Sequence, residues 1–170
     1  MRLVSFMQPK KQTTHWGVDL GVTIYVPNRD PRWNQNIDSM LALIDAGSEA
    51  QQTLSALLEG VQQDYCVAMD NIELLAPIPR PRQNVICLGL NYQDHIAETA
   101  TEQEVKLPRS PVVFTKSANS VNGPYADIEI DINVSAKMDW EVELAVIIGN
   151  PGLSIPEHDA MDYVFGYTVL

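Results

Sequence analysis

Apolar and polar residues alternate over several short stretches of the chain, a pattern typical of β-strands that bury one face. Side chains two residues apart point to the same face of a strand, so alternation separates an apolar face from a polar one. Alternation and short apolar runs predict a hairpin over residues 16–26 and strands over residues 2–6, 85–88, 111–116, 126–134, 139–149 and 166–170. We therefore expect a chain rich in β-sheet.

Helical spacing of apolar residues begins after the predicted hairpin. Residues 37–44 predict one helix, and Gly47 stands where such a helix would stop. A second helix is predicted over residues 48–60, because a serine stands at its start and a glycine near its end. Two further short helices are expected over residues 91–99 and 157–163.

A proline-rich stretch divides the chain. Three prolines within residues 77–82 predict an extended, stiff connector between two domains. Residues 1–76 would form a small α/β N-terminal domain, and residues 77–170 would begin a second domain. The predicted fold class is α+β, with mainly β-structure.

The charge and the cysteines narrow the classes of function. The net charge is −11, spread along the chain, and such a protein repels phosphate backbones and anionic lipids. This argues against binding nucleic acid or a membrane surface. Cys66 and Cys87 lack metal or redox spacing, so both are interpreted as small core residues of a reduced protein. The first apolar run is too short for a signal peptide, and no stretch reaches the ~20 apolar residues that cross a bilayer, so we expect a cytoplasmic location.

Two glutamates alternate within the predicted strand 139–149. Glu141 and Glu143 would project from the same face, among apolar neighbours of a strand that is usually covered on both sides. Repulsion between the carboxylates would be costly unless one is protonated, a cationic side chain pairs with them, or a metal lies between them. Their oxygens suit Mg²⁺, Mn²⁺ or Ca²⁺ rather than zinc. The alternative is an edge strand whose glutamates face water.

A histidine and a lysine are further candidates for chemistry. His95 and Glu98 lie three residues apart in the predicted helix 91–99, so their side chains would share one face. A carboxylate beside an imidazole fixes its tautomer and raises its basicity, as the activation of water requires. The alternative is an ordinary surface pair. Lys116 ends the predicted strand 111–116 and would reach either into a cleft or into solvent.

Four segments together resemble the fumarylacetoacetate hydrolase family: residues 85–98, 111–116, 139–149 and 162–168. The first contains Asn-Tyr-Gln-Asp-His-Ile-Ala-Glu and the third Asp-Trp-Glu-Val-Glu-Leu-Ala-Val-Ile-Ile-Gly, and both are long, ordered and correctly separated. The resemblance is strong over residues 77–170 and looser before them, where the family commonly has a small variable domain. It implies a mixed β-sandwich roll, incomplete at the C-terminus, for the second domain.

The resemblance also implies roles for the candidate residues. In the family the Glu-x-Glu pair, here Glu141 and Glu143, binds Mg²⁺ or Mn²⁺. The histidine and glutamate, here His95 and Glu98, activate water in the hydrolase members. The lysine, here Lys116, is similar to one that stabilises developing negative charge.

The implied activity is hydrolysis, or related cleavage of a carbon–carbon bond, in a small 2-keto or 1,3-diketo acid of the acylpyruvate or fumarylacetoacetate type. The reaction would pass through a metal-held enolate, and it would serve the catabolism of aromatic compounds. Other members decarboxylate, isomerise or dehydrate through the same enolate, and the sequence does not choose among them. The family tends toward homodimers. A catalytically inactive domain that acts as a binding or dimerisation module is the alternative from another class.

One departure from the family concerns the end of the chain. The third metal ligand of the family, an aspartate soon after the Gly-Tyr-Thr strand, would lie beyond Leu170. A second active-site lysine and a Gly-Thr-Pro turn would also follow later. Mg²⁺ held by two glutamates and water alone is expected to bind weakly. We therefore expect the 170 residues to be a fragment or a truncated gene product rather than a working enzyme.

Overall fold

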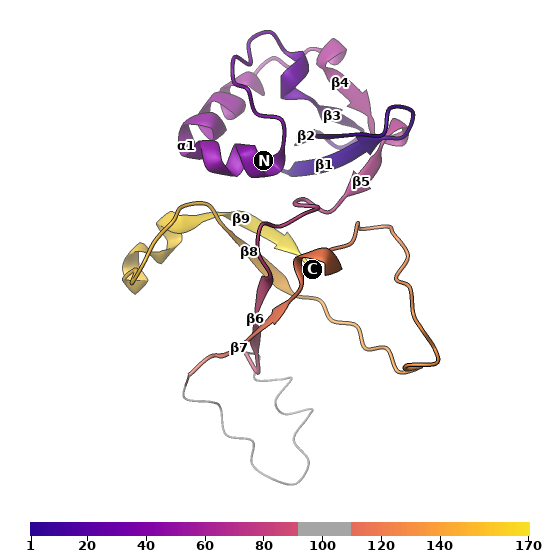
Figure 1. Cartoon of the computed structure of the whole chain (residues 1–170). Coiled ribbons are helices and arrows are strands. Elements are labelled where there is room, and N and C mark those ends of the chain that lie inside the picture. Colours follow the sequence, from indigo (N-terminus) through magenta and orange to yellow (C-terminus); the bar gives the residue numbers. More distant parts are fainter. Residues whose placement is uncertain (92–109) are drawn as a thin grey trace. The chain divides into compact units, whose positions relative to one another are not determined.

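The computed structural model describes residues 1–91 and 110–170 (Figure 1). These residues divide into two compact units: residues 1–79 together with 122–170, and residues 80–121. The division after residue 79 falls within the proline-rich stretch. The assignment of residues 77–170 to one domain stays a prediction.

An antiparallel sheet of five strands lies in the N-terminal part of the first unit (Figure 1). Its order is β4-β3-β2-β1-β5, and its strands are β1 (Leu3–Gln8), β2 (Thr13–Asp19), β3 (Thr23–Tyr25), β4 (Cys66–Ala68) and β5 (Glu73–Leu75). The strand predicted over residues 2–6 and the hairpin over residues 16–26 are confirmed. Gly21 provides the positive φ of 102° that the hairpin turn requires. The short strands β4 and β5 were not predicted.

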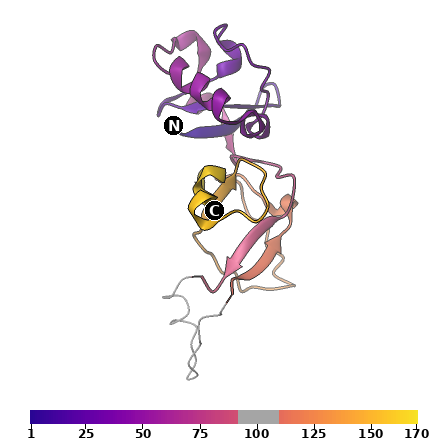
Figure 2. The same cartoon turned by 90° about the vertical axis from the view of Figure 1, so that its left-hand side faces the viewer.

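One long helix, α1 (Met40–Leu57), packs against this sheet (Figures 1 and 2). The Ser39 side chain caps it by accepting a hydrogen bond from the backbone N–H of Ala42 at 3.2 Å. Gly47, with φ 71° and ψ −157°, interrupts the helical backbone within α1. The prediction of two helical segments separated at Gly47 is thus confirmed, whereas the cap at Ser39 was not foreseen.

Both faces of the five-stranded sheet carry buried apolar side chains. On one face, Trp16 and Tyr25 pack against Leu43 and Leu54 of α1, and all four are 2% exposed or less. The opposite face holds a smaller cluster built from Phe6, Ile24 and Val26. Alternation along the strands therefore places apolar residues on both sides of the sheet.

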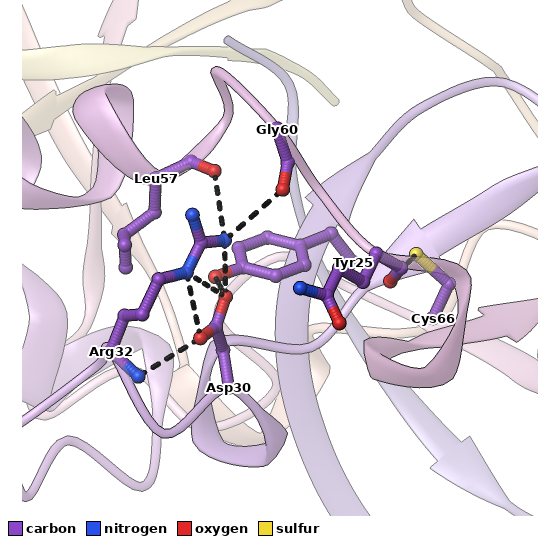
Figure 3. Close-up of polar contacts among 7 residues, drawn as sticks. Tyr25, Asp30, Arg32, Leu57, Gly60 and Cys66 are labelled. Atoms are coloured by element: carbon purple, nitrogen blue, oxygen red, sulfur yellow. Dashed lines mark hydrogen bonds and ion pairs between the residues drawn. The ribbon is translucent and has the colours of Figure 1, made fainter.

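An ion pair between the buried carboxylate of Asp30 and the exposed side chain of Arg32 fixes the loop between β3 and α1 (Figure 3). The guanidinium of Arg32 donates to Asp30, with the shortest distance 2.6 Å, and the hydroxyl of Tyr25 donates to the same carboxylate at 2.9 Å. Arg32 also donates to the carbonyl oxygens of Leu57 and Gly60, at 3.4 Å each. The loop is thereby tied to the C-terminal end of α1. Short 3₁₀ turns complete this part of the chain: η1 (Pro27–Arg29), η2 (Gln63–Tyr65) and η3 (Met69–Asn71).

The second unit is built on an antiparallel pair of strands, β6 (Val85–Gly89) and β7 (Val112–Lys116), followed by the turn η4 (Ala118–Ser120). These strands confirm the predictions for residues 85–88 and 111–116. The side chain of Asn84 accepts a hydrogen bond from the backbone of Ala118 at 3.4 Å, which closes the open end of the pair. The helix predicted over residues 91–99 lies outside the described residues.

A second antiparallel pair, β8 (Leu144–Ile148) and β9 (Val164–Val169), belongs to the first unit. The turn η5 (Glu157–Tyr163) precedes β9 and confirms the predicted short helix as a 3₁₀ turn. The backbone N–H of Gly149 donates to the carbonyl of Tyr163 at 2.8 Å, which fastens the loop between the two strands. The strand predicted at the end of the chain is confirmed, and the one predicted over 139–149 is assigned only in its second half.

The prediction of a strand over residues 126–134 is wrong. Residues 126–131 have no regular secondary structure, and residues 132–134 form a turn. Alternation of apolar and polar side chains suits a strand, but a strand forms only when its backbone N–H and C=O groups make hydrogen bonds with a neighbouring strand. Among the described residues, no strand pairs with this segment.

The fold class predicted from the sequence is confirmed: the chain is α+β, mostly sheet, and every strand pair found in the described residues is antiparallel. Within the same residues, no helix has both the length and the apolar composition needed to span a bilayer.

Candidate metal and keto-acid site

The Glu-x-Glu segment leads directly into β8. Glu143 extends the β8–β9 ladder by one residue pair, because its backbone N–H donates to the carbonyl of Leu170 at 2.8 Å and its carbonyl accepts from the N–H of Leu170 at 2.9 Å. Directly opposed residues of an antiparallel pair share one face, and so do residues two apart. Glu143 therefore lies on the same face as Ala145 and Thr168, which form the next pair on that side.

Thr168 is a neighbour of the candidate site that the sequence analysis did not single out. Its hydroxyl belongs to the same face of the ladder as Glu143, and the exposed Tyr167 and Val169 belong to the opposite face. Alternation within the Gly-Tyr-Thr segment would have indicated this, had the register between the two strands been known.

The expectation that this strand is covered on both faces is wrong for the described residues. Trp140 and Val142 are 84% and 71% exposed, and Glu141 is exposed as well, whereas Glu143 is half-buried. In this part of the chain β8 has one neighbouring strand, β9, and no second layer covers the face of Leu144. Mutual repulsion in a dry interior is therefore no argument for a metal here, and the metal role of both glutamates stays a prediction.

The chemistry of the donors still suits a hard divalent cation. Carboxylate oxygens are preferred by Mg²⁺, Mn²⁺ and Ca²⁺, and the ladder fixes the backbone of Glu143. Across residues 1–91 and 110–170, no three or more His, Cys, Asp or Glu side chains are grouped so that they could hold an ion. Glu141 and Glu143 thus fit as two ligands of an octahedral ion, with water or other groups in the remaining positions.

Of the other candidate catalytic residues, the structure describes Lys116. Lys116 is the last residue of β7, lies opposite Val85 and is exposed to solvent. His95 and Glu98 lie outside the described residues, so their pairing and their roles stay predictions. Cys87 is buried, as expected of a small core residue, and Cys66 is partly buried.

The first unit contains a largely apolar cavity of about 580 Å³, whose lining includes Leu3, Ile44, Phe165 and Thr168. Neither glutamate of the Glu-x-Glu segment lines it. Charged groups on the lining come from Arg2 and Asp19, which pair with each other at 3.2 Å. We therefore do not assign the keto-acid site to this cavity.

Comparison with known proteins defines the class. The family model of the fumarylacetoacetate (FAA) hydrolase C-terminal domain matches residues 84–170, a stretch that includes all of the candidate residues. The relatives of this chain that are named below are enzymes that act on small keto acids. The chain therefore belongs to the fumarylacetoacetate hydrolase family.

Among curated proteins, the mitochondrial oxaloacetate tautomerase of Xenopus laevis is 39% identical over 172 residues, covering 99% of this chain and 50% of that protein. The human mitochondrial oxaloacetate tautomerase is 37% identical over 173 residues, covering 99% and 51%. An oxaloacetate tautomerase of Bacillus subtilis is 42% identical over 106 residues, covering 62% and 35%. The chain spans about half the length of the curated relatives it matches.

Solved structures of related proteins have a similar fold. A fumarylacetoacetate hydrolase from Exiguobacterium antarcticum is similar with a TM-score of 0.71 and 34% identity, covering 99% of this chain and 54% of that one. A maleylpyruvate hydrolase from Sphingobium, solved with manganese(II) and pyruvate, has a TM-score of 0.71 and 25% identity, covering 99% and 57%. The fold of the chain is thus that of the family.

Proposed function

We propose that the chain is part of a divalent-metal-dependent enzyme that interconverts the keto and enol forms of a small 2-oxo dicarboxylic acid such as oxaloacetate. The observation that carries this proposal is the match, over 99% of the chain, to relatives that are named oxaloacetate tautomerases. Isomerisation was an alternative in the sequence analysis, and the names of the curated relatives support it.

The reaction moves one proton from carbon to oxygen. A proton leaves C3 of the 2-oxo acid, the electrons of that C–H bond form the C2–C3 double bond, and a proton joins the former carbonyl oxygen. A divalent ion, Mg²⁺ or Mn²⁺ with Ca²⁺ as a further possibility, would supply positive charge that stabilises the negative charge developing on the substrate oxygens.

The residues of the chain take the remaining roles. Glu141 and Glu143 would hold the ion through their carboxylates, and Lys116 would stabilise negative charge on the substrate. His95, oriented by Glu98, would accept and return the proton, because an imidazole with a carboxylate partner exchanges protons near neutral pH. The assignment of these five residues rests on the sequence motifs.

The test measures how fast the enol form of oxaloacetate decays, followed by its ultraviolet absorbance. The assay contains Mg²⁺ or Mn²⁺ together with the protein as its gene encodes it. We expect decay faster than in buffer with the same metal. Glu143→Gln and a chelator should each abolish the acceleration, and Glu49→Gln, which changes an exposed glutamate of α1, should leave it intact. An acceleration that survives both Glu143→Gln and the chelator would contradict the proposal.

Hydrolysis is the second candidate function. It is supported by the 34% identical structure of a fumarylacetoacetate hydrolase and by the resemblance of His95 and Glu98 to a water-activating pair. Chromatography of an acylpyruvate incubated with the protein distinguishes the two functions, because only hydrolysis releases pyruvate and a second acid. If the protein hydrolyses the acylpyruvate, His95→Gln should abolish the release of pyruvate and the second acid.

The remaining predictions concern partners and location. We keep the prediction of a homodimer, which sedimentation velocity tests directly. We also keep the prediction that the partner molecule is a small keto acid. A catalytically inactive binding or dimerisation module would take up no Mg²⁺ or Mn²⁺ in a calorimetric titration. The sequence predicts the cytoplasm, whereas the vertebrate relatives carry "mitochondrial" in their names, and cell fractionation distinguishes the two locations.

A further inference from the structure

One face of the β8–β9 ladder is half-buried and carries a carboxylate and a hydroxyl among apolar side chains. Its residues come from the start of the ladder on both strands: Glu143, Ala145, Ile147, Gly166, Thr168 and Leu170. All of them except Leu170 are half-buried, whereas the residues that alternate with them are exposed. Apart from Glu143 and Thr168, none of them has a polar group in its side chain.

Thr168 is the diagonal neighbour of Glu143 on this face. Glu143 lies directly opposite Leu170, and Thr168 lies opposite Ala145, two residues further along β8. Diagonal neighbours of an antiparallel pair are about 7–8 Å apart, a separation that a long side chain spans. Because Ala145 has only a methyl group, it leaves room for the carboxylate and the hydroxyl to meet. Within the described residues, neither group takes part in a side-chain hydrogen bond or an ion pair, so both are available for this contact.

We propose that Thr168 is a positioning residue for Glu143: its hydroxyl donates a hydrogen bond to the carboxylate oxygen that does not face the metal ion. This role depends on the proposed function, in which Glu143 holds Mg²⁺ or Mn²⁺. A carboxylate that is half-buried among apolar side chains needs a hydrogen-bond donor, because removing a charge from water is otherwise costly. A donor behind a metal ligand also orients that ligand, and its loss weakens metal binding by about ten- to a hundredfold.

The alternative role of Thr168 is purely structural. Threonine favours strands because its branched side chain packs well on a pleated surface. Valine has the same shape and the same preference, but it has no hydroxyl. Thr168→Val therefore removes the hydrogen-bond donor and keeps the strand, while Thr168→Ser keeps the donor.

Calorimetric titration with Mn²⁺ of the protein as its gene encodes it tests the proposal. We expect Thr168→Val to weaken Mn²⁺ binding by about tenfold without lowering the melting temperature. Thr168→Ser should retain the affinity of the parent protein to within about threefold, because the donor is still present. Thr14→Val makes the same exchange at an exposed position of β2, and this matched control should bind Mn²⁺ as the parent does.

The same titration in the Glu143→Gln background shows whether Thr168 acts through Glu143. Thr168→Val should cause no further loss of affinity there, because the charged acceptor of its hydrogen bond is gone. Three results would each overturn the proposal while leaving Glu143 as a metal ligand: parental affinity in Thr168→Val, a tenfold loss in Thr168→Ser as well, or an undiminished effect of Thr168→Val in the Glu143→Gln background. Absence of Mn²⁺ uptake by the parent protein would instead overturn the proposed function, and the role of Thr168 with it.

Discussion

Glu143 and Leu170 face each other at the end of the β8–β9 ladder, joined by two backbone hydrogen bonds of 2.8 and 2.9 Å. This pair fixes the backbone of Glu143, while Glu141, two residues earlier, lies outside the assigned strand. If the ladder continued, the residue opposite Glu141 would be the second one after Leu170, because each step along one strand is matched by one step along the other. The backbone of Glu143 is therefore fixed by hydrogen bonds to Leu170.

The first prediction concerns metal affinity. Glu141→Gln and Glu143→Gln should each weaken Mn²⁺ binding at least about tenfold, because the neutral amide is a poorer ligand than a carboxylate for a hard cation. Isothermal titration calorimetry of the chain measures the effect, with Glu49→Gln as the matched control. Equal affinity in all three variants would remove both glutamates from the metal site.

The second prediction concerns the ion pair between Asp30 and Arg32. Hydrogen bonds from Arg32 hold the pKa of Asp30 at about 2, below its ordinary 3.8. A lowered carboxyl pKa contributes stability that is present above pH 3.8 and is lost as the pH falls toward 2. Asp30→Asn should therefore lower the free energy of unfolding by about 2 kcal/mol at neutral pH, and the difference from the parent chain should shrink below pH 4.

Urea denaturation between pH 2 and 7 measures this difference. Tyr25→Phe is the matched control, because it removes one hydrogen bond to Asp30 and leaves the ion pair with Arg32 in place. Its cost should be about 1 kcal/mol, and smaller than that of Asp30→Asn. A pH-independent difference between Asp30→Asn and the parent would show that the charge of Asp30 does not stabilise the fold.

The third prediction concerns two strand glycines. Gly17→Ala would place a Cβ atom 2.6 Å from a side-chain carbon of Ile24 and still closer to the carbonyl oxygen of Tyr25, so β2 and β3 would have to separate. We expect a loss of about 1–3 kcal/mol in the free energy of unfolding. A Cβ atom added at Gly166 in β9 would meet nothing within 4 Å, so Gly166→Ala should be neutral or slightly stabilising. Thermal unfolding of the two variants and the parent chain measures both effects.

The fourth prediction concerns adjacent residues of β8 that belong to opposite faces. Val146 is 47% exposed, whereas Ile147 packs against the main hydrophobic cluster. Val146→Lys should raise the concentration at which the chain aggregates, because it adds charge to an exposed apolar face, with little change in melting temperature. Ile147→Lys should lower the melting temperature by several degrees, because it buries a charge. Light scattering and thermal unfolding measure the two effects.

Local signals predicted most of the elements correctly. The interruption of the helix at Gly47 followed from the conformational freedom of glycine, and the strand pair β6–β7 followed from two short apolar runs. The strands β4 and β5 were missed because each has three residues, too few for a periodic pattern, and both depend on contacts distant in sequence. The segment 126–134 was predicted wrongly because alternation describes side chains, while a strand also requires a partner.

The candidate site was predicted from motifs, and its surroundings were not. The sequence predicted that Glu141 and Glu143 lie within a strand, whereas β8 begins at Leu144 and only Glu143 extends its ladder, opposite Leu170. The exposure of Trp140 could not be predicted, because burial depends on which layer of structure covers a strand rather than on the strand itself. For the same reason Thr168 emerged as a neighbour of Glu143 only from the register.

The order of strands in the five-stranded sheet has a consequence for synthesis on the ribosome. Its last member to be translated is β5, whose Leu75 pairs with Ser5 of the first strand. Every strand of that sheet, and the whole of α1, has therefore left the exit tunnel well before the Glu-x-Glu segment follows. Domains generally fold as they emerge, N-terminal part first. The nascent chain can thus carry an already folded N-terminal sheet while Glu141 and Glu143 are still being added.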